Sequence, residues 1–303
     1  MQVSGLFYCL GFLTVSAPAL AGGMPTGFNT QVLCDGAFGR VGFAQDAAIL
    51  DLGGRVLILE EAISASGARY VNEAEKAEFW SKGNKARLTW GEADMDCTLQ
   101  TSDHPWVAHG NEPGWRISVE EGRFRAELDY GETVIEGDLP PAQVAVHGLT
   151  YDMETFGLTI RSEICHDDMS GQTYPESAVL SLGETTLRGC AGAPADLLSG
   201  PEWQIEEVAG TEVIDATPAT LAFQDMQVSG STGCNRFTGG FELTGEGLRF
   251  GPLAATRMMC PEAQMQQEAR VLDALSNVDR FDIDETGALI LYGADQPLMT
   301  ARR

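Results

Sequence analysis

The positions of the cysteines are the feature that most constrains how this chain can fold. Seven occur among 303 residues, and the first, Cys9, lies within an apolar N-terminal run. Six thiols permit many pairings, but their distribution favours pairing of neighbours, because each bridge then stays within one third of the chain. We therefore expect three small domains, each stabilised by roughly 3–4 kcal/mol through its disulfide. The expected bridges are Cys34–Cys97, Cys165–Cys190 and Cys234–Cys260.

The N-terminus predicts export. Residues 1–21 carry no charged side chain, Leu6 to Val15 form an apolar run, and Ala19-Leu20-Ala21 offers small residues for cleavage. The run is too short for a convincing transmembrane helix. We expect a signal peptide cleaved near Ala21, and a periplasmic or secreted protein with no membrane insertion after cleavage. Disulfides agree, since they persist in oxidising compartments.

The charge balance excludes two classes of partner. The chain has 44 Asp+Glu against 19 Lys+Arg, a net charge of −25 at pH 7. A protein this acidic does not attract nucleic acid or anionic lipid by general electrostatics. It does attract a basic protein. The alternative is that the acidity only keeps the protein soluble.

Short β patterns separated by glycine-containing turns fill most of the chain, which predicts a mainly β protein. Breaks at Thr98–Pro105 and Ala191–Pro201 resemble linkers. We expect domains at 27–99, 105–193 and 197–303. The clearest strand patterns are 55–59, 87–90, 115–119, 124–128, 158–164, 178–182, 220–223, 248–250 and 289–291.

One helix is expected after Pro261, a residue favoured in the first helical turn. Apolar residues then recur at spacings of three and four, which predicts one apolar face that covers a sheet. That face comprises Met265, Ala269, Leu272, Leu275 and Val278.

Familiar catalytic patterns are missing. The sequence contains no H-E-x-x-H, G-x-S-x-G, phosphate-binding loop or C-x-x-C. Its four histidines, His104, His109, His147 and His166, lack ligand spacing. We therefore predict that the protein is not an enzyme and holds no metal or cofactor. The acidic segment 165–168 could bind a hard cation, but a solvated loop is the favoured interpretation.

The first domain carries the most specific motif. Ser64-Ala65-Ser66-Gly67-Ala68-Arg69-Tyr70 is followed by Phe79-Trp80-Ser81-Lys82-Gly83, by Ala86-Arg87-Leu88 and by Cys97. Framed by Cys34 and Cys97, this segment resembles the MliC family of periplasmic and membrane-bound inhibitors of c-type lysozyme. The resemblance implies a small antiparallel β-barrel that projects Ser66 and Lys82 from adjacent loops into the lysozyme cleft. Gly67, Tyr70 and Gly83 complete the candidate target-binding set.

The chemistry of lysozyme is consistent with this resemblance. Lysozyme uses two carboxyl groups, one a general acid and one ionised. A lysine ammonium between them would pair with the ionised group, and a serine hydroxyl can donate to one carboxyl and accept from the other. Tyr70 and Trp80 are expected to pack the barrel or brace the loop. The connection between them is slightly longer than the family pattern, so it either extends a remote hairpin tip or shifts Lys82 relative to Ser66.

The middle segment resembles an uncharacterised bacterial envelope domain. The resemblance rests on His109-Gly110-Asn111-Glu112-Pro113-Gly114-Trp115 together with Cys165–Gly171, Tyr174-Pro175 and Gly189-Cys190. Glu112 and Asp167 could be functional acids, but roles in building turns are favoured.

The last segment resembles the META domain of heat-inducible HslJ-like envelope lipoproteins. The matching residues include Trp203, Ser229-Gly230, Gly233-Cys234-Asn235-Arg236-Phe237, Gly239 and Thr256–Cys260. This resemblance implies an antiparallel sheet with one packed helix and a general role in envelope stress. Asn235 and Arg236 are expected to stabilise a turn.

Three hypotheses follow from the sequence. The leading one is an inhibitor that blocks the active-site cleft of c-type lysozyme, a basic protein. The alternative is a non-catalytic envelope-stress binding or scaffold protein without lysozyme inhibition. The third, a hydrolase that uses Glu112 or the 165–168 loop, is the least favoured.

Overall fold

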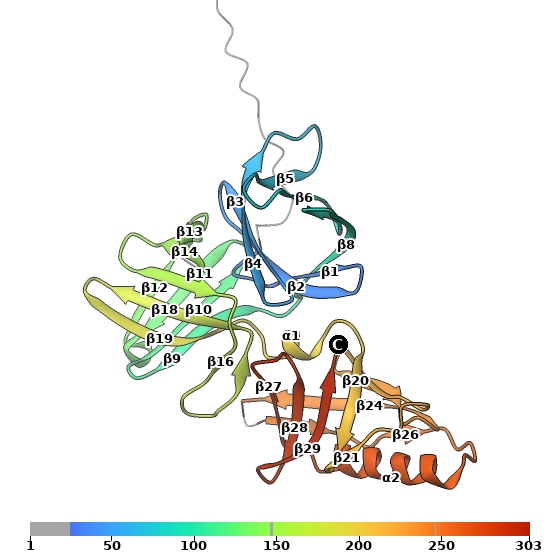
Figure 1. The fold of residues 1–303 in the computed structure, drawn as a ribbon. Helices are drawn as coiled ribbons and strands as arrows, with labels where there is room; N and C mark the ends of the chain where they lie inside the picture. Colours follow the sequence, from blue (N-terminus) through green and yellow to red (C-terminus); the bar gives the residue numbers. More distant parts are fainter. Residues whose placement is uncertain (1–24, 146–147, 246) are drawn as a thin grey trace, which may run out of the picture.

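A computed structural model describes residues 25–145, 148–245 and 247–303. The expected signal peptide and its cleavage site near Ala21 lie outside the described residues. Three antiparallel β domains follow one another along the chain, so the expected mainly β fold is confirmed (Figure 1). The three expected disulfides all form, and each joins two cysteines of the same domain.

The first domain is a closed eight-stranded barrel in which each strand pairs with its neighbours in sequence. Alternating residues face inward, as Phe79 and Leu88 show, because both are fully buried. The barrel closes where the first strand pairs with the last, and Cys34 lies directly opposite Cys97 at this seam. The strands are β1 (Thr30–Cys34), β2 (Ala37–Phe43), β3 (Ala47–Leu52), β4 (Arg55–Ala62), β5 (Ala68–Asn72), β6 (Ala77–Lys82), β7 (Lys85–Trp90) and β8 (Ala93–Thr101).

The middle domain is a nine-stranded antiparallel sheet in the order β12-β11-β10-β9-β19-β18-β15-β14-β13, with a small β16–β17 pair beside it. Its disulfide ties Cys165 of β16 to Cys190 of β19. A 3-10 turn, η1 (Asp129–Gly131), joins β11 to the edge strand β12. The strands are β9 (Trp106–Asn111), β10 (Gly114–Glu120), β11 (Arg123–Leu128), β12 (Thr133–Asp138), β13 (Gln143–Ala145), β14 (Gly148–Asp152), β15 (Gly157–Arg161), β16 (Cys165–His166), β17 (Thr173–Tyr174), β18 (Glu176–Leu182) and β19 (Thr185–Ala191).

The C-terminal domain is a sheet in the order β25-β24-β23-β22-β20-β29-β28-β27, with β21 and β26 as short additions and helix α2 packed against it (Figure 1). A short helix, α1 (Ala195–Leu198), precedes it. The elements are β20 (Trp203–Val208), β21 (Thr211–Glu212), β22 (Ala219–Gln224), β23 (Gln227–Ser231), β24 (Arg236–Thr244), β25 (Gly247–Phe250), β26 (Ala254–Ala255), α2 (Glu262–Ser276), β27 (Arg280–Ile283), β28 (Leu289–Gly293) and β29 (Gln296–Arg302).

Two local expectations differ from the structure. The face of α2 that packs on the sheet is centred on Val271 and Leu275, whereas Met265 is 49% exposed. The buried face includes Gln267, because its side-chain amide satisfies backbone groups of Ile214, Thr217 and Thr232. The first linker is also shorter than expected, since β8 continues to Thr101.

The three domains contact one another directly. Phe28 and Ile49 of the barrel belong to the same hydrophobic cluster as the core of the middle domain. The Arg303 guanidinium lies 4.0 Å from the Phe38 ring and 4.1 Å from the Trp203 ring, which joins the barrel to the C-terminal domain. His166 Nε2 lies 2.9 Å from Asp282 Oδ1, which joins the other two domains.

A buried acid lies where the barrel meets the middle domain. Glu176 is 1% exposed and accepts hydrogen bonds from the Phe28 backbone N–H at 2.7 Å and from Trp106 Nε1 at 2.9 Å. Burial raises the pKa of Glu176 to about 7, against the opposing effect of these hydrogen bonds and of nearby Arg40; Asp196 raises it further.

This acid makes stability depend on pH. The ordinary pKa of glutamate, 4.5, is lower than the value of about 7 in the fold, so the folded state binds more protons between these two values. Stability should therefore fall as pH rises from 4.5 to about 7, and then level off. Glu176→Gln keeps an acceptor and should remove this component. Urea unfolding of both proteins at about pH 5 and about pH 8 tests it; equal pH dependence in the two would contradict the assignment.

Candidate functional site

Strand register brings the two motif segments of the barrel together. Ala68 of β5 pairs with Ser81 of β6, so the connection that precedes Ala68 lies beside the end of β6. Gly67 has a φ of +71°, and a Cβ at this position would overlap the Ser81 carbonyl oxygen and lie 3.2 Å from Lys82 Cβ. Only glycine allows this approach, which places Ser66 next to Lys82.

Two hydrogen bonds hold the backbone at Ser66. Its carbonyl oxygen accepts from Trp80 Nε1 at 2.9 Å and from Ser64 Oγ at 2.7 Å. The Ser66 side chain is exposed, and its hydroxyl has no partner among the described residues. The backbone is therefore fixed while the hydroxyl is free to donate and to accept.

Lys82 lies at the exposed end of β6, at the edge of a two-residue turn. Gly83 has a φ of +61°, while the following Asn84 does not share this conformation, a pattern typical of a type II′ turn with glycine first. A Cβ at Gly83 would meet open space, so its role is conformational. Within the described ranges, the Lys82 ammonium forms no ion pair.

Tyr70 lies behind this surface. Its side chain is 8% exposed and its ring centroid is 5.9 Å from that of Phe43 in the barrel core. Burial, with a smaller effect of Glu61, raises the pKa of Tyr70 to about 12. The structure thus brings Ser66, Gly67, Lys82 and Gly83 to one end of the barrel and places Tyr70 in the core that supports them.

The longer connection between Tyr70 and Trp80 lies away from this end. The β5–β6 register is uninterrupted from Ala68↔Ser81 to Asn72↔Ala77, so the extra residues form the tip of the hairpin at its opposite end. The Glu75 backbone N–H donates to Asn72 Oδ1 at 3.0 Å within that tip. The extension therefore lies at the opposite end of the hairpin from Ser66 and Lys82.

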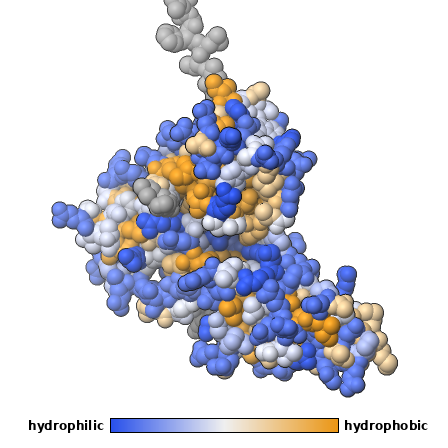
Figure 2. Space-filling view, in the orientation of Figure 1, coloured by the Kyte–Doolittle hydropathy of each residue, from blue (hydrophilic) through white to orange (hydrophobic). Residues whose placement is uncertain are grey.

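Sequence reasoning missed two residues of this surface. Ile63, in the same connection as Ser66, is 97% exposed, and the available signal was an apolar residue within a turn segment. Lys85 faces Lys82 across the turn. In the space-filling view, an apolar patch stands at this end of the barrel among more hydrophilic residues (Figure 2). We call residues 63–67 and 82–85 the barrel tip.

The acidic residue of the middle-domain motif builds a turn. Asp167 Oδ1 accepts from the Met169 and Ser170 backbone N–H groups and from Ser170 Oγ, and Oδ2 accepts from Asn111 Nδ2 at 2.8 Å. Burial would raise its pKa, but these hydrogen bonds outweigh that effect and lower it to about 2. His109 Nε2 lies 3.3 Å from Oδ2. Asp167 thus joins two motif segments, and no group of three potential metal ligands is found in the described part of the chain.

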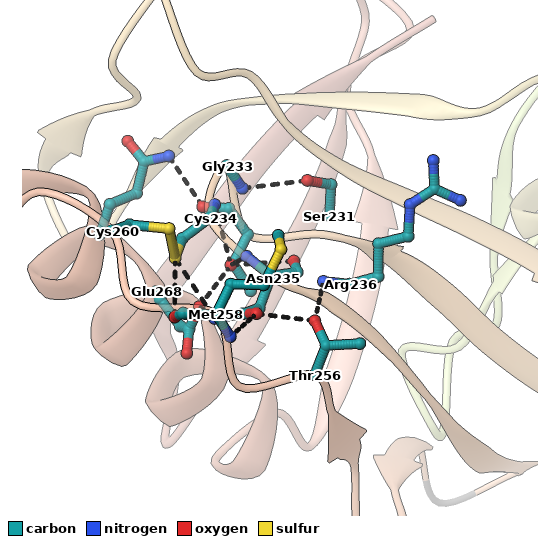
Figure 3. The surroundings of a disulfide bond; sticks show 11 residues. Ser231, Gly233, Cys234, Asn235, Arg236, Thr256, Met258, Cys260 and Glu268 are labelled. Carbon is teal, nitrogen blue, oxygen red and sulfur yellow. Dashed lines mark hydrogen bonds between the residues drawn. A yellow bond between two sulfur atoms is a disulfide. The ribbon is translucent and has the colours of Figure 1, made fainter.

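The motif of the C-terminal domain also builds structure. Asn235 is 2% exposed; its Oδ1 accepts from Thr256 Oγ1 at 2.7 Å and from the Met258 backbone N–H at 2.8 Å, and its Nδ2 donates to Glu268 Oε2 at 2.8 Å. This network lies beside the Cys234–Cys260 disulfide, and the Arg236 side chain extends away from it (Figure 3). Asn235 therefore ties two loops to helix α2 (Figure 3).

Comparison with known proteins identifies two of the three domains. Residues 34–96 match the family model of the membrane-bound lysozyme inhibitor of c-type lysozyme, and residues 196–303 match that of the META domain. Both matches agree with the domain layout expected from the sequence. No curated protein matches the chain.

Two solved structures illustrate the structural comparisons. An NMR structure of a protein from Burkholderia xenovorans is 28% identical, covers 36% of this chain and 85% of its own, and has a TM-score of 0.31. A DNA polymerase sliding clamp from Pseudomonas aeruginosa is 8% identical, covers 91% of this chain and 92% of its own, and has a TM-score of 0.15. At these TM-scores neither bears on function.

The close approach at Gly67 gives a stability prediction with an internal control. Gly67→Ala would force a residue with a Cβ into the left-handed backbone region and would place that Cβ against the Ser81 carbonyl oxygen. The variant should therefore be destabilised by roughly 2–4 kcal/mol. Gly91→Ala shares the positive φ but meets nothing within 4 Å, so it should cost only about 1 kcal/mol. Chemical denaturation of both variants measures the difference. Equal costs would show that Gly67 does not lie against β6.

Proposed function

We propose that this protein is an extracytoplasmic inhibitor of c-type lysozyme, with no catalytic activity of its own, that inserts Ser66 and Lys82 into the substrate cleft. One observation carries the proposal: Ser66 and Lys82 lie in adjacent segments at one exposed end of the barrel, and neither side chain has a polar partner among the described residues. The match of residues 34–96 to the lysozyme-inhibitor family supports the same assignment.

The inhibitory chemistry follows from the carboxyl groups of the target. The Lys82 ammonium donates to the ionised carboxylate, and the Ser66 hydroxyl bridges to the general acid. Each hydrogen bond to a charged group contributes about 1.5–3 kcal/mol in a site from which water is excluded. The barrel tip then occupies the space of the sugar ring, so the substrate cannot bind.

In the described part of the chain, the barrel meets the other two domains through residues outside the barrel tip. The hydrogen bonds and ring contacts that join the barrel to them involve residues such as Gly27, Gln31, Phe38, Arg40 and Asp51, none of which belongs to the tip. The middle and META domains would then fix the base of the barrel and leave its tip open to a large partner.

The compartment and the net charge fit this function. Three disulfides favour an oxidising, periplasmic or secreted location, and the described residues include no helix with the length and apolarity to cross a membrane. Many c-type lysozymes are basic, so a protein with a net charge of −25 would be attracted to them from a distance.

Lysis of bacterial cell walls by a purified c-type lysozyme tests the proposal. The wild-type protein should slow lysis, and Lys82→Ala should raise the concentration needed for half inhibition by about 10- to 100-fold because it removes the charge-assisted contact. Ser66→Ala should have a smaller effect in the same direction. Lys76→Ala is the matched control, since it removes the same charge from the opposite end of the β5–β6 hairpin.

If about 10 μM wild-type protein leaves the lysis rate unchanged, inhibition is wrong and the scaffold alternative gains support. If inhibition occurs but Lys82→Ala and Lys76→Ala behave alike, the mechanism is wrong although the function stands.

A further inference from the structure

The lysines of this protein are unusually placed. The sequence contains three, Lys76, Lys82 and Lys85, all within ten residues of one another, in a chain whose net charge is −25. Lys82 and Lys85 are paired residues at the ends of β6 and β7, directly opposite each other across the Gly83–Asn84 turn, and both are exposed. Like charges directly opposite on neighbouring strands destabilise a sheet.

Neighbouring cations on the same outward face are neutralised. Arg69 on β5 pairs with Glu78 on β6 at 2.7 Å, and Arg87 on β7 pairs with Asp94 on β8. The remaining acid in this region, Asp96, lies opposite Arg87. Lys85 itself pairs with Lys82 of β6 on one side and with Thr98 of β8 on the other.

Neither lysine of the turn has an acidic partner among the described residues. In a chain with 44 acidic side chains, two adjacent unpaired ammonium groups form a surface complementary to two adjacent anions. Binding of such anions would relieve the repulsion between them.

We propose that Lys85 is a second target-binding cation, which pairs with the general acid of lysozyme while Lys82 pairs with the ionised carboxylate. This inference rests on the proposed function. The spacing is compatible with this contact: Cβ atoms of directly opposite residues are about 4.5–5.5 Å apart, so two flexible lysine side chains that start there can reach the two carboxyl groups of a retaining glycosidase, which are about 5–5.5 Å apart. Ser66, beside Lys82, then bridges the two pairs.

The two-cation contact couples the binding of lysozyme to the ionisation of its general acid. The general acid of lysozyme has a pKa near about 6 and is protonated in the active enzyme. The Lys85 ammonium favours the ionised form of this general acid. Complex formation below that pH therefore releases the carboxyl proton to solvent, while the lysine stays protonated. Binding therefore strengthens as pH rises through about 6, because the proton no longer has to be removed.

The experiment is titration calorimetry of a purified c-type lysozyme with the full-length protein and with Lys85→Gln, Lys82→Gln and Lys76→Gln, at about pH 5 and about pH 7.5. The wild type should bind more tightly at the higher pH. Lys85→Gln should weaken binding there by about 10- to 100-fold and lose most of the pH dependence. Lys76→Gln makes the same change in net charge at the far end of the hairpin and should bind like the wild type. Lys85→Arg, which keeps the charge, should retain the pH dependence.

The outcomes separate the two proposals. If Lys82→Gln weakens binding while Lys85→Gln matches the wild type at both pH values, the role of Lys85 is wrong and the inhibitory function stands. If Lys85→Gln weakens binding without altering its pH dependence, pairing with the general acid is wrong. If the wild type does not bind lysozyme, both proposals fail.

Discussion

The close approach of Gly67 to the backbone of Ser81 is the contact on which the barrel tip depends. A side chain at Gly67 would overlap the Ser81 carbonyl oxygen, so any other residue would push the Ser66 segment away from β6. The approach also requires a fixed register between β5 and β6. The paired residues of these two strands run without a break from Ala68↔Ser81 to Asn72↔Ala77. The missing side chain at Gly67 and the β5–β6 register thus place Ser66 beside Lys82.

The other domains fix the barrel without covering its tip. The barrel shares a hydrophobic cluster with the middle domain through Phe28 and Ile49, and Glu176 binds the chain at Phe28 across the same boundary. The C-terminal residue, Arg303, closes the junction between the barrel and the META domain. The β5 end of the barrel lies away from the META sheet (Figure 1). The polar motifs of these two domains, centred on Asp167 and Asn235, are occupied by internal hydrogen bonds, which favours structural roles for them.

Much of the fold could be predicted from local sequence signals, because each signal acts through its own neighbours. Cysteine spacing gave the three disulfides, and alternation at 55–59 and 124–128 predicted strands that form as β4 and β11. Helix α2 was predicted, and Leu275 and Val278 of its expected apolar face are buried, but Met265 and Ala269 are exposed. The buried Gln267 amide accepts a hydrogen bond from the Ile214 N–H and donates to the carbonyl oxygens of Thr217 and Thr232. These partners are distant in sequence, so the periodicity of the helix does not reveal them.

The site was predictable in its residues but not in its geometry. The motif pointed to Ser66 and Lys82, whereas the burial of Tyr70 and the pairing of Lys82 with Lys85 depend on strand register. The central claim is that the barrel tip occupies the lysozyme cleft. The most direct test measures lysozyme affinity while a short, cleft-binding oligosaccharide of the cell wall is raised in concentration. Our account predicts strict competition, with apparent affinity falling in proportion to cleft occupancy. Undiminished binding to lysozyme whose cleft is saturated would contradict it.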